Sequence, residues 1–280
     1  MSVNLLYVDD AVVAVDKPAG IVVHPGWAQD EGGLVRQVRA LLGKPAHPVH
    51  RLDRSASGVV LFALSSEAAR RLGEAFAQGR VDKRYFALVR GQPPADALID
   101  HPIPAREGGA RVPARTWVRG LGAGMAPWQR YGLCEARPLT GRLHQIRRHL
   151  KHIACPIIGD VNYGKGDHNR RFREEFGLHR LALHAFALGF VHPVTGTAMT
   201  ITAAPSGELA TCLERLGFAG AIAAALSDST REQAARVGRD EADAAAQGRH
   251  VGLIAGGDED RGAGEDALPA GDVGGAFEEQ

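Results

Sequence analysis

The segment H-R-L-D-R-S-A-S-G at residues 50–58 runs directly into the apolar segment V-V-L-F-A-L at 59–64. An apolar run of this length predicts a buried strand, and the serine and glycine before it suit a tight turn at the strand entrance. Asp53 lies between Arg51 and Arg54, and nearby positive charge lowers the pKa of a carboxyl group. A carboxylate in this position can be a nucleophile or a base, or it can belong to a structural salt-bridge loop.

Strands and helices are mixed along the first three quarters of the chain. Alternating apolar residues predict strands, and apolar residues three or four positions apart predict helices. The predicted strands are 5–8, 12–15, 59–64, 81–91, 131–136, 180–185 and 199–202, and the predicted helices are 34–42, 66–78, 144–153 and 207–216. Residues 103–130 are rich in glycine and proline, so we expect them to be irregular.

Charge is distributed unevenly between two parts of the chain. Residues 1–226 contain 28 Lys+Arg and 19 Asp+Glu, a net charge of +9, whereas residues 227–280 contain 5 and 13, a net charge of −8. A basic folded part suits a phosphate-rich partner such as RNA. From about residue 227 the sequence has no periodicity and few apolar residues. We therefore expect one folded domain at 1–226 and a disordered acidic tail at 227–280.

Several features bear on the cellular compartment. The 3 cysteines are odd in number and widely separated, which predicts reduced thiols in the cytoplasm rather than a disulfide framework. No apolar run approaches the ~18 residues of a membrane span, and the first residues lack the pattern of a signal peptide. We expect a cytoplasmic monomer that does not contact a membrane.

Two other groups of residues suggest binding chemistry. His144, His149 and His152 invite a metal interpretation, but only His149 and His152 share a helix face. No carboxylate or cysteine completes a tetrahedral set at the usual spacing, so we expect no metal. Within 103–130, arginines alternate with tryptophans, which suits either phosphate contact with base stacking or a solvated loop anchored by its tryptophans. These residues are Arg106, Arg111, Arg115, Arg119, Arg130, Trp117 and Trp128.

The motifs around Asp53 and in four other places resemble those of the RluA-type pseudouridine synthases. The matching segments are V-D-K-P-A-G at 15–20, H-R-L-D-R-S-A-S-G at 50–58, K-R-Y-F-A-L-V-R-G at 83–91, T-G-R-L-H-Q-I-R-R-H-L at 140–150 with P-I-I-G-D at 156–160, and R-L-A-L-H-A at 180–185. One departure is Ala56, where threonine is common in the family. The resemblance implies an α+β fold: a long mixed, mostly antiparallel sheet with flanking helices and a central cleft.

The resemblance also implies a reaction and a set of site residues. The reaction isomerises a uridine within RNA to pseudouridine and needs no cofactor. Asp53, Tyr85 and Arg147 are the expected catalytic residues: the carboxylate, the aromatic ring beside the uracil, and the arginine that pairs with the aspartate. Arg142 is the second candidate for that pairing. The expected substrate-binding residues are Arg51, which would fill the gap left by the flipped base, Leu183 and Arg142.

Two segments narrow the resemblance to one subgroup. Residues 128–134 (W-Q-R-Y-G-L-C) and 164–180 are similar to a subgroup that modifies uridine 65 in the T-stem of certain tRNAs. Two alternatives remain open at this point. One is a related enzyme that acts on ribosomal RNA. The other is an RNA-binding protein without catalysis, which would have no need of Asp53.

Overall fold

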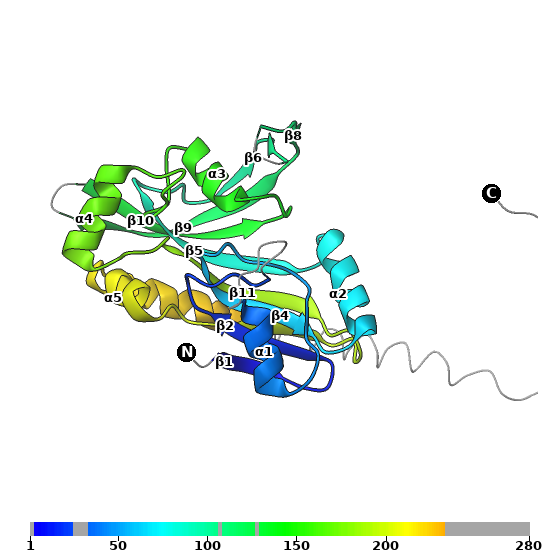
Figure 1. Ribbon diagram of the computed structural model, residues 1–280. Helices are drawn as coiled ribbons and strands as arrows, with labels where there is room; N and C mark the ends of the chain where they lie inside the picture. The colour runs from blue at the N-terminus through cyan, green and yellow to red at the C-terminus, as the bar shows by residue number, and fades with distance from the viewer. Residues whose placement is uncertain (1–2, 25–32, 106–107, 127–128, 233–280) are drawn as a thin grey trace, which may run out of the picture. The chain divides into compact units, whose positions relative to one another are not determined.

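The computed structural model describes residues 3–24, 33–105, 108–126 and 129–232. A ten-stranded sheet forms its centre (Figure 1). The strand order is β1 (Asn4–Val8), β2 (Val12–Lys17), β4 (Ser57–Ala63), β11 (Leu183–Val191), β5 (Asp82–Arg90), β10 (Gln129–Pro138), β9 (Arg115–Ala126) and β6 (Ala97–Asp100). In addition, β3 (His47–Pro48) pairs with β4 and β12 (Ala198–Thr202) with β11, while β7 (Ile103–Pro104) and β8 (Arg111–Val112) form a separate pair.

The sheet is mixed because β4 and β11 run parallel, whereas the other pairs of described strands are antiparallel. This confirms the expected α+β fold with a mostly antiparallel sheet. The parallel pair is possible because a long stretch of chain, including β5 and β10, separates its two strands in sequence.

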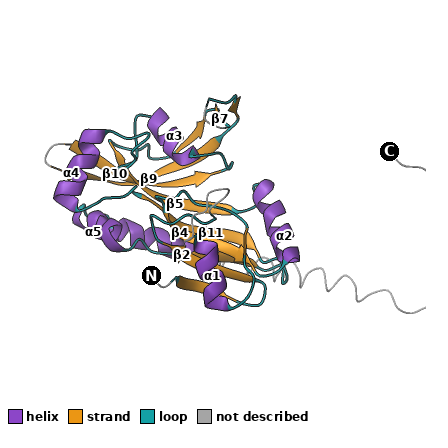
Figure 2. Cartoon of the chain, viewed as in Figure 1, coloured by secondary structure: helices purple, strands orange, loops and turns teal. Residues whose placement is uncertain are grey.

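Helices cover both faces of β4, which explains its unbroken apolar sequence. Val59 and Leu61 belong to the same core cluster as buried residues of α2 (Ser66–Ala77), whereas Val60 and Phe62 share a second cluster with those of α1 (Leu34–Leu42). Figure 2 shows these two helices beside this part of the sheet. All of β4 is buried, and each fully buried Val, Leu or Phe contributes about 1.5–3 kcal/mol.

The predicted helices are found as α1, α2, α3 (Gln145–His152) and α5 (Gly207–Arg215). α2 begins as a serine N-cap predicts: the Ser65 hydroxyl accepts a hydrogen bond from the Ala68 backbone N–H at 3.1 Å. Gly79 follows with a positive φ of 69°, a conformation that glycine adopts without strain.

The expectation of an irregular segment at 103–130 is wrong in its larger part. The twelve-residue β9 occupies this stretch and pairs with β10 and β6. Trp117 in β9 donates a hydrogen bond to Asp96 at 2.6 Å, and the Arg137 guanidinium lies 4.9 Å from its ring centroid. The ring is therefore half-buried and held by side chains of the protein itself. Arg106 and Trp128 lie outside the described residues.

Other boundaries differ from the prediction. α4 (Gly166–Phe176) forms in a polar segment that we assigned to no helix, and it buries Phe172. β11 begins at Leu183, three residues later than expected. A further helix, Ala219–Glu232, runs beyond the expected domain boundary at 226.

The last helix is held to the sheet by polar contacts as well as by the core. The buried Arg84 of β5 donates to Ser229 at 3.2 Å and is paired with Glu232. Because those contacts need residues beyond 226, the folded part extends at least to residue 232. The remainder of the predicted disordered tail, 233–280, lies outside the described residues and stays a prediction.

Within the described residues, no single helix is long and apolar enough to cross a membrane. α5 and the helix Ala219–Glu232 pass a test of length and composition together, but they are bent by 118° relative to each other. Leu209, Leu213 and Ala225 of these helices are buried in the core cluster beneath β5 and β10, which accounts for their apolar character.

Candidate active site

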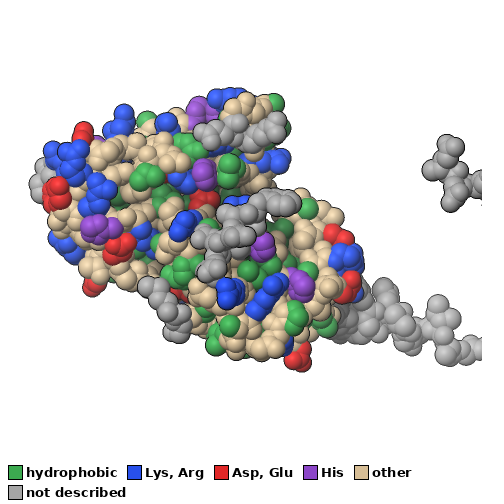
Figure 3. Space-filling model, in the orientation of Figure 1, with side chains coloured by type: hydrophobic (Ala, Val, Ile, Leu, Met, Phe, Trp, Pro, Cys, Tyr) green, Lys and Arg blue, Asp and Glu red, His purple; other side chains and the backbone are tan. Residues whose placement is uncertain are grey.

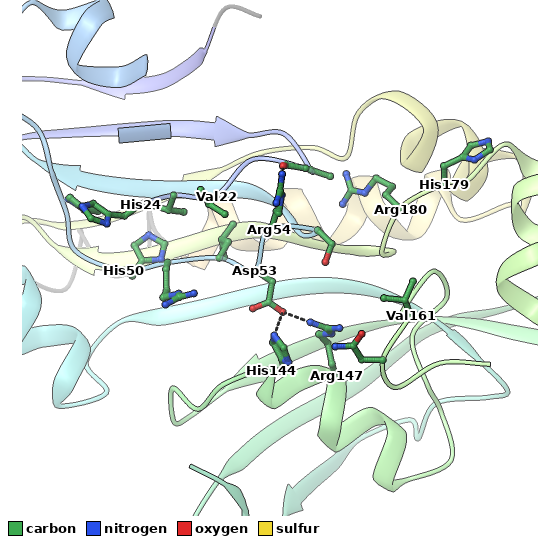
Figure 4. Close-up of a pocket in the computed structure, with 18 of the residues that line it drawn as sticks. Val22, His24, His50, Asp53, Arg54, His144, Arg147, Val161, His179 and Arg180 are labelled. Carbon is green, nitrogen blue, oxygen red and sulfur yellow. Dashed lines mark hydrogen bonds and ion pairs between the residues drawn. The ribbon is translucent and has the colours of Figure 1, made fainter. Parts of the chain in front are cut away.

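A cavity of about 510 Å³ is lined by all six residues that the sequence singled out: Asp53, Tyr85, Arg147, Arg51, Leu183 and Arg142. A second cavity of about 790 Å³ adjoins it, and Asp53, His144 and Arg147 line both. Figure 4 shows the second cavity with Asp53 at its centre. Sites of this size are typical of small-molecule or nucleotide-sized ligands.

The turn into β4 brings Asp53 to this position. Gly58 has φ 112°, and a Cβ there would overlap the carbonyl group of Ala185 in β11. Only glycine therefore allows the two parallel strands to approach at this point. The loop that precedes β4 is thereby directed into the cavity at the start of the parallel pair.

Arg147 of α3 joins Asp53 to a second, fully buried carboxylate. Its Nη1 donates to Asp53 Oδ2 at 3.0 Å, while Nε and Nη2 donate to the two oxygens of Asp160 at 2.7 and 2.9 Å. Burial alone would raise the pKa of Asp160, but hydrogen bonds from Arg147 and the Tyr163 backbone lower it below its usual value. Asp160 thus holds the Arg147 guanidinium so that its Nη1 points at Asp53.

His144, the residue just before α3, lies close to Asp53. Its Nε2 lies 3.9 Å from Asp53 Oδ2 (Figure 4), and its Nδ1 lies 3.2 Å from the Tyr163 hydroxyl group. The backbone of His144 has φ 53°, a left-handed conformation that is uncommon for residues other than glycine. Burial and neighbouring arginines lower the pKa of His144, although the charge of Asp53 opposes them.

Tyr85 and Leu183 belong to the apolar part of the lining of the smaller cavity. They project from the adjacent strands β5 and β11, where Ala185 pairs with Tyr85 and Leu183 pairs with Ala87. Burial and the charge of Asp53 raise the pKa of Tyr85 above its usual value, so its phenol remains neutral. A flat ring and an aliphatic side chain beside a carboxylate suit a planar, uncharged ligand such as a nucleobase.

Arg51 and Arg142 are exposed residues of the cavity lining. Within the described chain, Arg51 forms no hydrogen bond or ion pair, so its guanidinium group is available to a ligand. Arg142 donates from Nε to the Pro113 carbonyl oxygen at 3.3 Å. Asp53 forms an ion pair with Arg147 in the described chain, and His144 Nε2 lies 3.9 Å from the same oxygen. Arg51 and Arg54, which flank Asp53 in the sequence, form no ion pair with it there.

Lys17 and Arg180 support the site, although the sequence interpretation assigned them no role. The buried Lys17 Nζ donates to the carbonyl oxygens of Pro18, Ile21 and Arg54 at 2.9, 2.8 and 3.2 Å. Burial lowers the pKa of Lys17 to about 7. These bonds tie the K-P-A-G loop to the Asp53 loop.

Arg180 secures the opposite side of the Asp53 loop. It donates to Ser57 Oγ at 2.8 Å and to the Leu183 carbonyl oxygen at 3.0 Å, and Ser57 lies 2.7 Å from His184 Nδ1. Lys17, Arg180 and Asp160 all belong to the motifs on which the family resemblance rests. Their presence in those motifs was the available signal.

The histidines of α3 are engaged by the protein. His149 is buried between Thr116 and the His101 carbonyl oxygen, and His152 stacks on the His101 ring at 3.7 Å. Across the described residues, no group of three His, Cys, Asp or Glu is placed to hold a metal ion.

The fold and the site together define a class of enzyme. The human protein "RNA Pseudouridylate Synthase Domain Containing 4" superposes with a TM-score of 0.62 at 26% identity, over 76% of this chain and 93% of that one. The human protein "RNA Pseudouridylate Synthase Domain Containing 1" gives 0.62 at 25% identity, over 75% and 87%. The sheet that presents Asp53 beside Arg147 and Tyr85 is therefore a pseudouridine synthase fold.

Sequence comparison gives the family. The model of the RNA pseudouridylate synthase family matches residues 11–152. The tRNA pseudouridine synthase C of Salmonella typhimurium is 43% identical, over 78% of this chain and 92% of the relative. The protein of the same name from Haemophilus ducreyi is 40% identical, over 72% and 91%. The chain belongs to the RNA pseudouridylate synthase family, whose members are isomerases.

Proposed function

We propose that this enzyme converts a uridine of tRNA to pseudouridine, and that the target is uridine 65 in the T-stem. The observation that carries the proposal is the pairing of Arg147 with Asp53 in a cavity that Tyr85 and Leu183 also line. The choice of tRNA is supported by the relatives named tRNA pseudouridine synthase C, which match most of the chain.

The reaction is an isomerisation in which every atom is retained. The bond between N1 of uracil and C1′ of ribose breaks, the base turns, and C5 bonds to C1′. The proton on C5 then leaves, and N1 carries a proton in the product. Asp53 acts as the nucleophile or as the base, Arg147 orients its carboxylate through a hydrogen bond, and Tyr85 stacks on the uracil and assists removal of the C5 proton.

The target nucleotide has to leave its stack before it can enter the cavity, at a cost of a few kcal/mol. Arg51, which lies at the cavity and has no partner in the described chain, would fill the space that the base vacates. Leu183 would contact the flipped base, and Arg142 would contact the RNA at the rim. Phosphate contacts from the basic domain offset the cost of flipping, and Figure 3 shows Lys and Arg side chains gathered over α4.

We further propose that the enzyme acts as a monomer in the cytoplasm, without a cofactor. Cys134, Cys155 and Cys212 are buried free thiols, which suits a reducing compartment. Isomerisation needs neither a redox partner nor a group donor.

The test is pseudouridine mapping by carbodiimide treatment and primer extension on total tRNA and rRNA. The cells lack this protein and are complemented with the wild type, with Asp53→Asn, or with Asp10→Asn. The last is a matched control, because Asp10 is an exposed residue of the turn between β1 and β2. We expect one T-stem signal to be restored by the wild type and by Asp10→Asn, but not by Asp53→Asn.

Other outcomes would favour the alternatives. A signal lost from rRNA instead of tRNA would preserve the chemistry and change the substrate. An unchanged pattern in both RNAs, with normal RNA affinity of the purified protein, would favour a binding protein without catalysis. Asp53→Asn should also lose turnover in vitro while retaining most of its RNA affinity, because the substitution leaves the basic surface intact.

A further inference from the structure

The two carboxylate oxygens of Asp53 have different surroundings. Oδ2 accepts the hydrogen bond from Arg147 Nη1 at 3.0 Å and is the oxygen that faces His144 Nε2 at 3.9 Å. Within the described residues, no hydrogen bond reaches Oδ1. One oxygen is therefore held by the protein, and the other is open to a ligand.

The Tyr163 hydroxyl group connects His144 to Arg148 of α3. Its oxygen accepts a hydrogen bond from Arg148 Nε at 2.9 Å, so its own proton is available for His144 Nδ1 at 3.2 Å. An Nδ1 that accepts a hydrogen bond places the proton of a neutral imidazole on Nε2. The negative charge of Asp53 favours the same tautomer, because it attracts an N–H more than a lone pair.

Asp160 positions two residues next to the site, Arg147 and Tyr163. It holds Arg147 through two hydrogen bonds. It holds Tyr163 through the backbone, since Asp160 Oδ1 accepts hydrogen bonds from the backbone N–H groups of Asn162 and Tyr163 at 2.9 and 3.0 Å. The Tyr163 ring also lies beneath the guanidinium of Arg147, whose carbon is 5.1 Å from the ring centroid. The tyrosine is thus fixed independently of His144.

The backbone of His144 is consistent with a positioning role. Its left-handed conformation is shared in the described chain with only one other non-glycine residue, Ala154. Such conformations cost on the order of 1 kcal/mol or more and are found where the surroundings enforce them, often at functional sites. Here the strained residue directs its ring between Tyr163 and Asp53.

We propose that Tyr163 and His144 form a positioning pair for Asp53. Tyr163 holds His144 as the Nε2–H tautomer, and this N–H acts with Arg147 Nη1 on Oδ2, so that Oδ1 is the oxygen that meets the uridine. Both residues act through Asp53 and do not touch the reacting atoms. The proposal deepens the proposed pseudouridine synthesis and rests on it for its rate measurements, but not for the tautomer.

The tautomer can be measured by ¹⁵N NMR of the full-length protein labelled in its histidines, without RNA. The resonances of His144 are assigned by their loss in His144→Asn, a substitution suited to the left-handed backbone because Asn tolerates it. We expect Nδ1 to show the shift of an unprotonated nitrogen, and Tyr163→Phe to give a mixture of tautomers. A proton on Nδ1 in the wild type, or a tautomer unchanged in Tyr163→Phe, would overturn the proposal.

Kinetics on a tRNA transcript test whether the two residues act as a unit. Tyr163→Phe and His144→Asn each remove the 3.2 Å hydrogen bond between these two residues. For both we expect kcat to fall about tenfold, as the loss of one ordinary hydrogen bond predicts, with KM changed less than about twofold. The double variant should be no slower than His144→Asn, because coupled residues are not additive. Tyr7→Phe is the matched control, since this hydroxyl bonds Asp9 in the first hairpin.

Additive losses of about 100-fold in the double variant, an effect confined to KM, or no loss at all would refute the pair. Thermal unfolding of each variant shows whether the protein remains folded. If the wild type itself does not modify tRNA, the proposed function fails, while the NMR result still decides the arrangement of His144. The two failures are thereby distinguished.

Discussion

Asp160→Asn should destabilise the protein and stop turnover, because Asp160 is the buried anion on which Arg147 depends. Its side chain is 0% exposed and that of Arg147 is 6% exposed. The carboxylate accepts four hydrogen bonds, two from Arg147 and two from the backbone. Removing one member of a buried pair costs about 3–5 kcal/mol. The asparagine oxygen keeps part of the network, so we expect a loss of about 3 kcal/mol, at the lower end of that range.

The assay is urea unfolding of the wild type, Asp160→Asn and Asp167→Asn. Asp167 provides the matched control: it also pairs with an arginine, Arg170 at 3.3 Å, but its side chain is 87% exposed. Exposed pairs contribute about 0–1 kcal/mol, so Asp167→Asn should unfold close to the wild type. Turnover of Asp160→Asn should be lost even where the variant is folded, because Arg147 would lose the partner that directs it toward Asp53.

The difference between wild type and Asp160→Asn should also depend on pH. Arg147 and the backbone lower the folded-state pKa of Asp160 despite the opposing effect of burial. A carboxyl group with a depressed pKa stabilises the protein above its unfolded pKa of about 3.9 and loses that contribution as pH falls through the folded value. The difference should be complete near neutral pH and shrink below about pH 4. The reasoning would be refuted by equal unfolding free energies at neutral pH, or by a difference that is constant into acid.

Three further changes test other parts of the structure. Lys17→Met leaves three carbonyl groups without their donor and should cost about 2 kcal/mol or more. Burial lowers the pKa of Lys17 to about 7, and the unfolded value is about 10.4. The unfolding free energy of the wild type, relative to Lys17→Met, should therefore increase as pH rises from the lower value to the higher one. Urea unfolding at these two pH values measures the difference, and an equal difference at both would contradict the prediction. Gly58→Ala places a methyl group against the Ala185 carbonyl, so we expect little soluble protein, and normal yield and melting would contradict this packing. A chain shortened to residue 226 loses the Glu232 partner of the buried Arg84 and should melt several degrees lower than one shortened to residue 232; equal melting temperatures would show that this contact contributes nothing.

The sequence predicted helices and strands correctly where the intrinsic propensity of the residues and the pattern of buried apolar side chains favour the same structure. The helix Leu34–Leu42 was predicted with its observed ends, because its apolar residues recur at helical spacing. β9 was missed because the glycines and prolines of residues 103–130 indicate irregular structure, whereas pairing with two neighbouring strands decides the conformation of β9. α4 was missed for a similar reason, since little more than Phe172 marks its buried side.

The sequence likewise predicted some features of the candidate site and not others. Motif resemblance singled out Asp53, Tyr85 and Arg147, and the structure brings these residues to one cavity. It could not predict that His144 faces Asp53, because that relation joins segments far apart in the chain. The hydrogen bonds between Asp160 and Arg147 join two parts of one motif, but the spacing of the motif does not show which side chains meet. The catalytic roles of all these residues remain proposals.

The order of the strands has a consequence for how the chain folds as it is synthesised. β4 and β5 do not pair with each other, because β11 lies between them and contacts both. Residues 183–191 are made long after Asp53, Tyr85 and Arg147, so a nascent chain on the ribosome can form two partial sheets but cannot join them. The long-range pairing that this requires predicts slow completion of the fold. The cavity would then be assembled only after β11 leaves the exit tunnel, and incomplete chains would not act on RNA.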